Sequence, residues 1–259
     1  MRAIWKGAIS FGLVTIPVGL YSATENKAPK FKLLHAKDHG PIKYKRTCET
    51  CQEEVAWEDI VRGYQVDKGR YAIFSEEELE AASPALAKTV DVVQFVESEE
   101  IDPIYYRSSY YLAPEKSGVK AYQIFQEALF DKRRVGLAKV AIRDREYLAT
   151  LRAGEGVLVL ETMFWPDEIR EPVFEELGGR VEVRPQEVDM AGQIIDNLTS
   201  PFKPDEWHDT SRESIEELAQ RKIEGEEIVA PQVEEPPKVV DLLDALKASV
   251  EATKKQAAG

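Results

Sequence analysis

Alternating apolar and polar residues run through most of the first 180 residues of the chain and predict β-strands there. The segment 60–74, IVRGYQVDKGRYAIF, has two such runs around Asp67-Lys68-Gly69, which predicts a hairpin with glycine at the position that needs a positive φ. Three further runs, 135–142, 147–152 and 157–163, are separated by short turns and predict an antiparallel meander. Many short strands with few helices between them are typical of a barrel or a sandwich. We therefore expect a mainly β fold with helical inserts.

Helical patterns occur as inserts in this core and throughout the region after Pro185. Ser75 and Glu78 have the spacing of a capping box, which predicts a short helix. The segment 118–132 predicts a longer helix. One face of that helix carries Tyr122, Phe125, Ala128 and Leu129.

After Pro185 the apolar positions recur at helical rather than strand spacing, which predicts a helix that ends at Ser200-Pro201. Its apolar stripe contains Val188, Ala191, Ile194, Ile195 and Leu198. A second, charged helix is predicted from Trp207 to Lys222. A thin apolar stripe on such an arm often packs on another surface, for example on a second subunit. These patterns divide the chain into a core of residues 1–184 and a helical arm of residues 185–224.

The C-terminal part combines a linker with an amphipathic helix. Residues 225–237 are rich in proline and glutamate and have no core-forming pattern, which indicates an acidic linker. In residues 238–259 the apolar positions at helical spacing are Val239, Leu242, Leu243, Leu246 and Val250. A helix of about four turns is too short to be stable alone in water. It therefore needs a partner surface, either in the same chain or in another protein.

Positive and negative charges are segregated along the chain, although the formal net charge is −13. Residues 1–51 contain nine basic and three acidic side chains, a local charge of +6. The part from Asp205 onward contains fourteen acids and seven bases, a local charge of −7. A second basic cluster, Lys132 to Arg134, follows the predicted helix of residues 118–132. The distribution argues against a protein that is basic all over, but it is compatible with positive charge concentrated in a groove or a hole.

The composition favours a globular protein of the cytoplasm. At 43% hydrophobic residues, the chain can bury a large core. No run reaches the roughly 18 consecutive apolar residues of a membrane span. The N-terminal stretch contains Lys6 and Pro17, so we expect it to form a strand of the mature fold. Two cysteines separated by two residues cannot form a disulfide framework, which favours a reducing compartment.

Residues 35–51, HAKDHGPIKYKRTCETC, contain both cysteines of the chain and two of its three histidines. Cys48 and Cys51 have the spacing of a knuckle that offers two thiolates to zinc. His35 and His39 would complete four ligands, with Asp38 as a weaker substitute. The alternatives are a metal-free turn with reduced thiols and redox chemistry, and the lack of a thioredoxin-like βαβ pattern argues against the latter. A structural zinc ion is therefore a candidate cofactor, since it would fix a hairpin in a region short of core residues.

Catalysis is not predicted. His208 and Ser211 are close in EWHDTSRES, but without a nucleophile elbow or an oxyanion hole, so a solvent-facing histidine is the better interpretation. The sequence contains no Gly-rich phosphate loop, no Walker motif and no carboxylate pair in a hydrolase context.

Five segments, in this order and at matching intervals, carry a family resemblance: MRAIWKGAISFGLVTIPVGLYSATE, LLHAKDHGPIKYKRTC, EDIVRGYQVDKGRYAIFSEEEL, EIDPIYYRSSYYLAPE and VVDLLDALKASVEATK. They resemble bacterial Ku over essentially the whole chain. The resemblance implies a homodimeric ring, built from a β-barrel and a strand-rich bridge, through which a double-stranded DNA end is threaded. It also implies that the helical arm embraces the partner subunit and that the C-terminal helix recruits a multifunctional ATP-dependent DNA ligase for non-homologous end joining.

The chain departs from the many bacterial Ku proteins that continue into a long lysine-rich tail. Only Lys254 and Lys255 lie close to its end. The DNA contacts that such a tail supports are therefore in doubt here, and stable capture of DNA should depend on the lumen of the ring.

A ring that accepts any DNA end should contact phosphates and sugars rather than base edges. Alternate residues of a strand share a face, so we expect Lys43 and Lys45 on one side of a strand, and likewise Lys30 and Lys32. The candidate DNA contacts are Lys27, Lys30, Lys32, Lys43, Lys45, Arg46, Lys132, Arg133 and Arg134. The candidate ligase contacts are the five apolar residues of the C-terminal helix, from Val239 to Val250. For any single lysine, a solvated surface charge is the alternative.

A second class of function is a zinc-ribbon adaptor that binds only proteins, through its C-terminal helix. It fits the two cysteines and the acidic tail, but it leaves the excess of basic residues near the N-terminus unexplained. Binding to DNA discriminates between the two classes.

Overall fold

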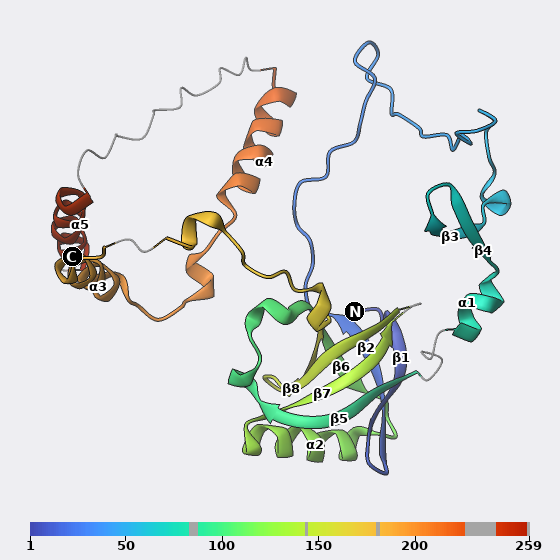
Figure 1. Ribbon diagram of the computed structural model, residues 1–259, viewed down its shortest axis with the longest axis horizontal. Helices are drawn as coiled ribbons and strands as arrows, with labels where there is room; N and C mark the ends of the chain where they lie inside the picture. The colour runs from blue at the N-terminus through green and yellow to red at the C-terminus, as the bar shows by residue number, and fades with distance from the viewer. Residues whose placement is uncertain (83–87, 143–144, 180–181, 226–241, 258–259) are drawn as a thin grey trace. The chain divides into compact units, whose positions relative to one another are not determined.

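The computed structural model describes residues 1–82, 88–142, 145–179, 182–225 and 242–257 (Figure 1). Its residues group into two compact units. The first unit comprises Met1–Lys27 and Lys32–Glu171, and the second comprises Ala28–Phe31 and Pro172–Gly259. The strands are β1 (Trp5–Phe11), β2 (Val14–Ser22), β3 (Arg62–Asp67), β4 (Arg70–Phe74), β5 (Thr89–Glu97), β6 (Tyr106–Pro114), β7 (Arg134–Ile142), β8 (Arg145–Ala153) and β9 (Leu158–Met163). The α-helices are α1 (Glu76–Ala82), α2 (Val119–Lys132), α3 (Pro185–Leu198), α4 (Thr210–Ile223) and α5 (Leu242–Ala257).

A closed β-barrel is the centre of the first unit, with the strand order β1-β2-β6-β9-β8-β7-β5. The strands β7, β8 and β9 are paired antiparallel to their neighbours, which confirms the predicted meander. The barrel closes where β1 pairs in parallel with β5, with Ala8 opposite Thr89 and Ser10 opposite Asp91. Closure removes the exposed edges that an open sheet would present. The structure therefore selects a barrel over the sandwich that the same sequence pattern allowed.

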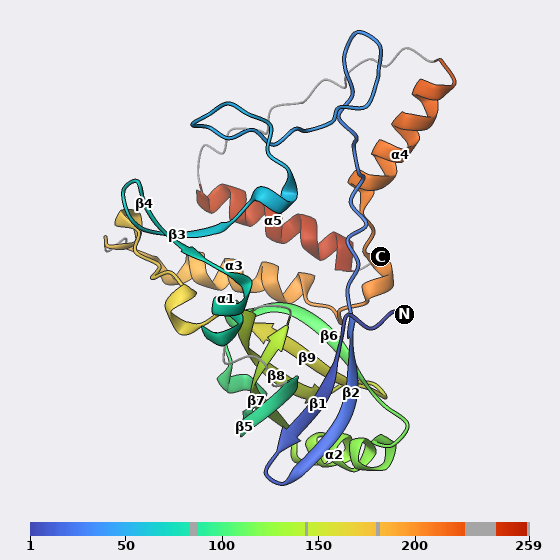
Figure 2. The ribbon, with the colours of Figure 1, turned by 90° about the vertical axis from the view of Figure 1, so that its right-hand side faces the viewer.

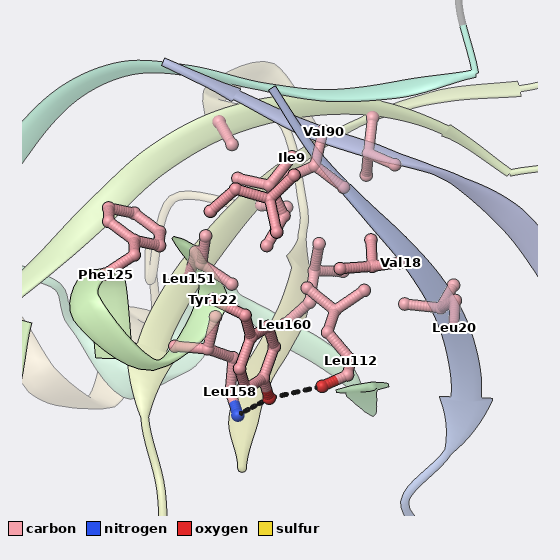
Figure 3. Close-up of a cluster of buried hydrophobic side chains, with 14 of the residues drawn as sticks. Ile9, Val18, Leu20, Val90, Leu112, Tyr122, Phe125, Leu151, Leu158 and Leu160 are labelled. Atoms are coloured by element: carbon pink, nitrogen blue, oxygen red, sulfur yellow. Dashed lines mark hydrogen bonds between the residues drawn. The ribbon is translucent and has the colours of Figure 1, made fainter. Parts of the chain in front are cut away.

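The interior of the barrel is filled by branched aliphatic side chains from nearly every strand (Figure 3). Ile9, Leu20, Leu112, Leu151 and Leu160 have no exposed surface. Complete burial of such a side chain contributes about 1.5–3 kcal/mol relative to leaving it in water. Because the inward positions of each strand are apolar and alternate with outward positions, the strands could be predicted from the sequence.

Helix α2 packs on β7 and β8 and adds its own apolar face to the core. Tyr122, Phe125 and Leu129, which the sequence pattern places on one face, are at most 5% exposed. The aromatic ring of Phe125 stacks on Phe11 of β1, with ring centroids 4.3 Å apart. Helix α2 therefore contacts β1, near the start of the chain, as well as β7 and β8, which follow it in the sequence.

The predicted hairpin is present as a separate two-stranded ribbon of β3 and β4. Gly69 has a φ of 78°, the left-handed conformation that its turn position requires. No residue of either strand is buried. A two-stranded ribbon is at best marginally stable alone in water. The predicted capping box follows it, since the Ser75 hydroxyl accepts from the N–H of Glu78 while the Glu78 carboxylate accepts from the N–H of Ser75.

The second unit is helical, as the change of period predicts. Helix α3 ends before Ser200-Pro201, in agreement with the sequence. The predicted start of the next helix at Trp207 is wrong, because α4 begins at Thr210 after Asp209, whose carboxylate accepts a hydrogen bond from the N–H of Arg212. Among the described residues, no helix is long and apolar enough to cross a membrane.

Candidate nucleic-acid interface

Two turns with the same hydrogen bonds form the segment that contains the predicted zinc ligands. In the first turn, the N–H of His35 donates to Gly40 O at 2.8 Å and the N–H of His39 donates to His35 O at 2.8 Å. In the second turn, Cys48 N donates to Glu53 O at 2.9 Å and Gln52 N donates to Cys48 O at 2.8 Å.

The fifth residue of each turn is left-handed, with a φ of 56° at His39 and 60° at Gln52. The alignment of the two turns therefore pairs His35 with Cys48 and Asp38 with Cys51. In this alignment His39 is the counterpart of Gln52, which is not a typical zinc ligand.

Hydrogen bonds stabilise the anionic form of one residue in each turn. The pKa of Asp38 is lowered by the backbone N–H of Gly40 and by the side chain of His35, whose Nδ1 lies 3.0 Å from Asp38 Oδ1. The pKa of the Cys48 thiol is lowered by the backbone N–H groups of Cys51 and Thr50 and by the Cys51 side chain. A thiolate at Cys48 suits a metal ligand.

The structure does not gather the four predicted ligands into one metal site. Within the described part of the chain, no group of three or more His, Cys, Asp and Glu side chains is placed to hold a metal ion. The donor types at His35, Cys48 and Cys51 still fit zinc. The zinc site therefore stays a prediction.

The basic residues between the two turns are solvent-exposed. Lys45 Nζ pairs with Glu54 Oε2 at 2.6 Å, and the Arg46 guanidinium lies over the ring of Trp57, 4.7 Å from its centroid. Lys43 makes no ion pair with any residue that the structure describes. Of these three cations, Lys43 therefore has the greatest freedom to contact a phosphate.

The prediction that these lysines lie on strands is wrong. Residues 42–46 and 28–33 have no strand pairing, and the surrounding segment has only the isolated bridges Leu34–Pro41 and Thr47–Glu54. Prolines at 29 and 41 remove backbone donors, and no apolar face is buried to hold a sheet together. Strand geometry therefore does not place Lys43 and Lys45 on one face, as was predicted.

The more N-terminal candidates are distributed over both units. Lys27 belongs to the first unit and lies 3.9 Å from Glu25, Lys30 belongs to the second unit, and Lys32 belongs to the first. All three side chains are exposed.

The cluster after α2 contains one paired arginine. Arg134 Nη1 pairs with Glu97 Oε1 at 2.5 Å. Arg133 ends α2 in a left-handed conformation with a φ of 51°. Lys132 lines a hollow of about 370 Å³ together with the rings of Phe11 and Phe95. The three residues are exposed, but Arg134 has less freedom than Lys132 to meet a phosphate.

Two further groups of cations were missed by the sequence analysis. Arg62, Lys68 and Arg70 lie on the exposed β3–β4 ribbon, and the hairpin pattern that predicted the ribbon could have identified them. Arg107 of β6 and Arg145 of β8 both pair with Glu168, at 3.9 Å and 2.7 Å. Glu168 therefore offsets one of the two positive charges of this second group, whereas the ribbon cations have no ion pair within the described residues.

The five predicted ligase contacts do not share one environment. Leu243 and Leu246 are half-buried and Val250 is buried, all on α5, which packs on α3. Leu242 is 63% exposed. Val239 lies outside the described residues.

Comparison with known families identifies the family to which this β-barrel belongs. The family model of Ku, described as the Ku70/Ku80 beta-barrel domain, matches residues 10–190. The chain belongs to the Ku family. The matched range includes eight of the nine strands in full and the last two residues of β1. Membership confirms the resemblance noted in the sequence, and it confirms the interpretation of the chain as a Ku protein without a catalytic site.

Three relatives extend the similarity to the whole chain, and each is named non-homologous end joining protein Ku. The protein of Heliobacterium modesticaldum is 46% identical, over 99% of this chain and 94% of its own length. The protein of Symbiobacterium thermophilum is 47% identical, over 100% of this chain and 65% of its own length. The Bacillus subtilis protein is 38% identical, over 98% of this chain and 83% of its own length. The Ku similarity therefore includes α3, α4 and α5 as well as the barrel.

Proposed function

We propose that this Ku chain forms a homodimeric ring that threads double-stranded DNA ends without regard to sequence and recruits an ATP-dependent DNA ligase for non-homologous end joining. The observation that carries the proposal is the Ku match over residues 10–190, together with the full-length similarity to relatives named for end joining. The exposed cations between the two turns and on the β3–β4 ribbon support it, because phosphates are their natural ligands.

The DNA contacts are assigned to lysines and arginines that have no competing carboxylate. Lys30, Lys32 and Lys43 meet this condition within the described residues, and so do Arg62 and Arg70 of the ribbon. Each phosphate contact releases condensed counterions, so binding weakens as salt rises.

The dimer contact is assigned to the arm, residues 185–224. The exposed fractions of Val188, Ile195 and Leu198 on α3 are 57%, 66% and 57%, and together they make an apolar stripe that a second subunit would cover. Phe202 and Trp207 continue this apolar surface along the chain, with exposed fractions of 77% and 75%. Burial against a second copy would remove this surface from water.

A structural zinc ion is the proposed cofactor of residues 35–51, with His35, His39, Cys48 and Cys51 as ligands. The matched turns make Asp38 the alternative to His39 as the fourth ligand. Bound zinc would hold together two turns that otherwise have no core.

The test is a gel-shift comparison of one duplex as a linear fragment and as a closed circle, before and after treatment with a chelator. We expect tight binding to the linear fragment of any sequence and none to the circle, because only an end can enter a ring. Equal binding to the circle contradicts threading, and no binding to either form supports the protein-only adaptor. Loss of both bound zinc and DNA binding after chelation supports the zinc site, whereas a protein that holds no zinc before chelation argues against it.

A further inference from the structure

Helix α5 lies side by side with α3 in the second unit (Figure 2). A hydrogen bond joins their C-terminal halves, in which Asn197 Nδ2 donates to Thr253 Oγ1 at 3.2 Å. The same hydroxyl donates to Ser249 O at 2.9 Å within α5. Thr253 is thereby held between its own helix and α3.

One face of α5 is covered by this packing. Leu243, Leu246, Val250 and Thr253 recur at i, i+3, i+7 and i+10, which places them on one side of the helix. Val250 is 7% exposed and Thr253 is 9% exposed, while Leu243 and Leu246 are half-buried. Leu242 lies off this face and is 63% exposed. The covered face therefore includes three of the five residues assigned to ligase binding.

The apolar positions of α3 are divided between two faces. Met190, Ala191, Ile194 and Asn197 are half-buried and recur at the spacing of the face toward α5. Val188, Ile195 and Leu198 are exposed on a neighbouring face. Helix α3 can therefore hold α5 and still offer an apolar stripe to a second subunit.

We propose that α3 masks the ligase-binding face of α5, so that the ligase must displace α3 before it can bind. The inference rests on the proposed recruitment of a ligase by α5. A single apolar face cannot contact two surfaces at once, so the two contacts exclude each other. A helix of this length is not stable alone in water, so α5 exchanges one partner surface for another. The ligase then binds only the undocked fraction, and its apparent affinity is lowered by that fraction.

Adjacent positions on α3 provide a matched pair of variants. Ile194→Asp puts a charge into the contact with α5, whereas Gln193→Asp puts the same charge on the exposed side of the same helix. Hydrogen exchange of residues 242–257 in the full chain reports docking, because an undocked α5 loses amide protection. Binding of a bacterial multifunctional ATP-dependent DNA ligase, titrated by biolayer interferometry, reports masking.

We expect Ile194→Asp to remove the amide protection of α5 and to tighten ligase binding, by about tenfold if α5 is docked about 90% of the time. Gln193→Asp should change neither. Asn197→Ala, which removes one hydrogen bond and adds no charge, should act in the same direction to a smaller extent and serves if Ile194→Asp does not fold. Masking is overturned if α5 loses its amide protection while the ligase affinity stays unchanged. It is also overturned if both Ile194→Asp and Asn197→Ala retain the protection.

The variant Leu246→Asp distinguishes a failure of masking by α3 from a failure of ligase recruitment by α5. It alters the shared face of α5 itself, so it should abolish ligase binding as well as docking. If Leu246→Asp binds the ligase as well as the unaltered chain does, recruitment by α5 is wrong, and masking is overturned with it. If Leu246→Asp loses the ligase while Ile194→Asp binds it no more tightly, recruitment stands and only masking is overturned.

Discussion

The hydroxyl of Tyr122 accepts a hydrogen bond from the backbone N–H of Leu158, with a donor-to-acceptor distance of 2.6 Å. The same hydroxyl donates to the backbone carbonyl of Leu112 at 2.5 Å, so one side chain of α2 connects β6 and β9 (Figure 3). Tyr122 itself is 4% exposed. Both backbone groups rely on this phenol at a place where water has little access.

Tyr122→Phe should therefore lower the free energy of unfolding by about 1–3 kcal/mol, because it leaves a buried donor and a buried acceptor without their partner. Urea unfolding followed by circular dichroism measures the change. Tyr71→Phe on the exposed ribbon is the control, since Tyr71 is 61% exposed, and its effect should stay within about 0.5 kcal/mol. Equal effects of the two substitutions would show that the hydrogen bonds of Tyr122 add no stability.

Burial also raises the pKa of Tyr122, which makes part of the stability pH-dependent. Below the ordinary tyrosine pKa of about 10, the phenol is protonated in both the folded and the unfolded chain. Above it, the unfolded chain loses the proton first, so the free energy of unfolding falls as the pH rises. The stability difference between the unaltered chain and Tyr122→Phe should be full at pH 8 and smaller at pH 11. A difference that grows over this range would contradict the sign.

The lowered pKa of Cys48 predicts thiolate reactivity at unusually low pH. We expect its alkylation by iodoacetamide, followed by mass spectrometry of the peptide, to reach half its maximal rate below the ordinary thiol value of about 8.5. The same protein in urea is the control, because unfolding removes the N–H groups of Cys51 and Thr50 from the sulfur. If zinc is bound, alkylation should be slow until a chelator is added.

Neutralisation of Lys30, Lys43 and Arg62 together, each to Gln, should weaken the binding of DNA ends and flatten its dependence on salt. Each lost phosphate contact removes about 0.9 from the slope of log K against log salt concentration, so three lost contacts per subunit, six in the homodimer, remove about 5.4. The matched control neutralises the exposed Lys116, Lys120 and Lys222, which changes the net charge equally. Fluorescence anisotropy at several salt concentrations measures both slopes. If the two triple variants have the same slope, the DNA contacts lie elsewhere.

Deletion of residues 238–259 should leave the binding of DNA ends intact and abolish the stimulation of an ATP-dependent ligase. The reason is that α5 belongs to the helical unit, whereas the barrel core is complete without it. Gel shift and a ligation assay with linear DNA measure the two outcomes. Stimulation that persists in the truncated chain would contradict recruitment by α5.

The barrel meander, the β3–β4 hairpin and α2 were all predictable, because each depends on residues close together in the sequence. Gly69 marks its turn directly, and the alternation from Val135 to Met163 follows inward and outward positions of three consecutive strands. The parallel pairing of β1 with β5 could not be predicted in this way. It joins Ala8 to Thr89 across a long insertion, and no local pattern encodes such a contact.

The site was less predictable than the fold. The sequence identifies which residues are basic, but a strand face cannot be assigned to Lys43 and Lys45 without a partner strand, and the structure shows none for residues 42–46. The ribbon cations Arg62 and Arg70 were missed because they do not form a continuous basic run in the sequence, as Lys132 to Arg134 do.

The sequence alone therefore determined the family, the strand-rich core, the helical arm and the amphipathic character of the last helix, since these follow from motifs and from local periodicity. Only the tertiary structure decided which strands pair to close the barrel, which residues its core buries, and that α3 rather than solvent covers Leu243, Leu246 and Val250. The physical reason is that an apolar stripe requires burial but does not specify its partner. That choice depends on contacts between segments that are distant in the sequence.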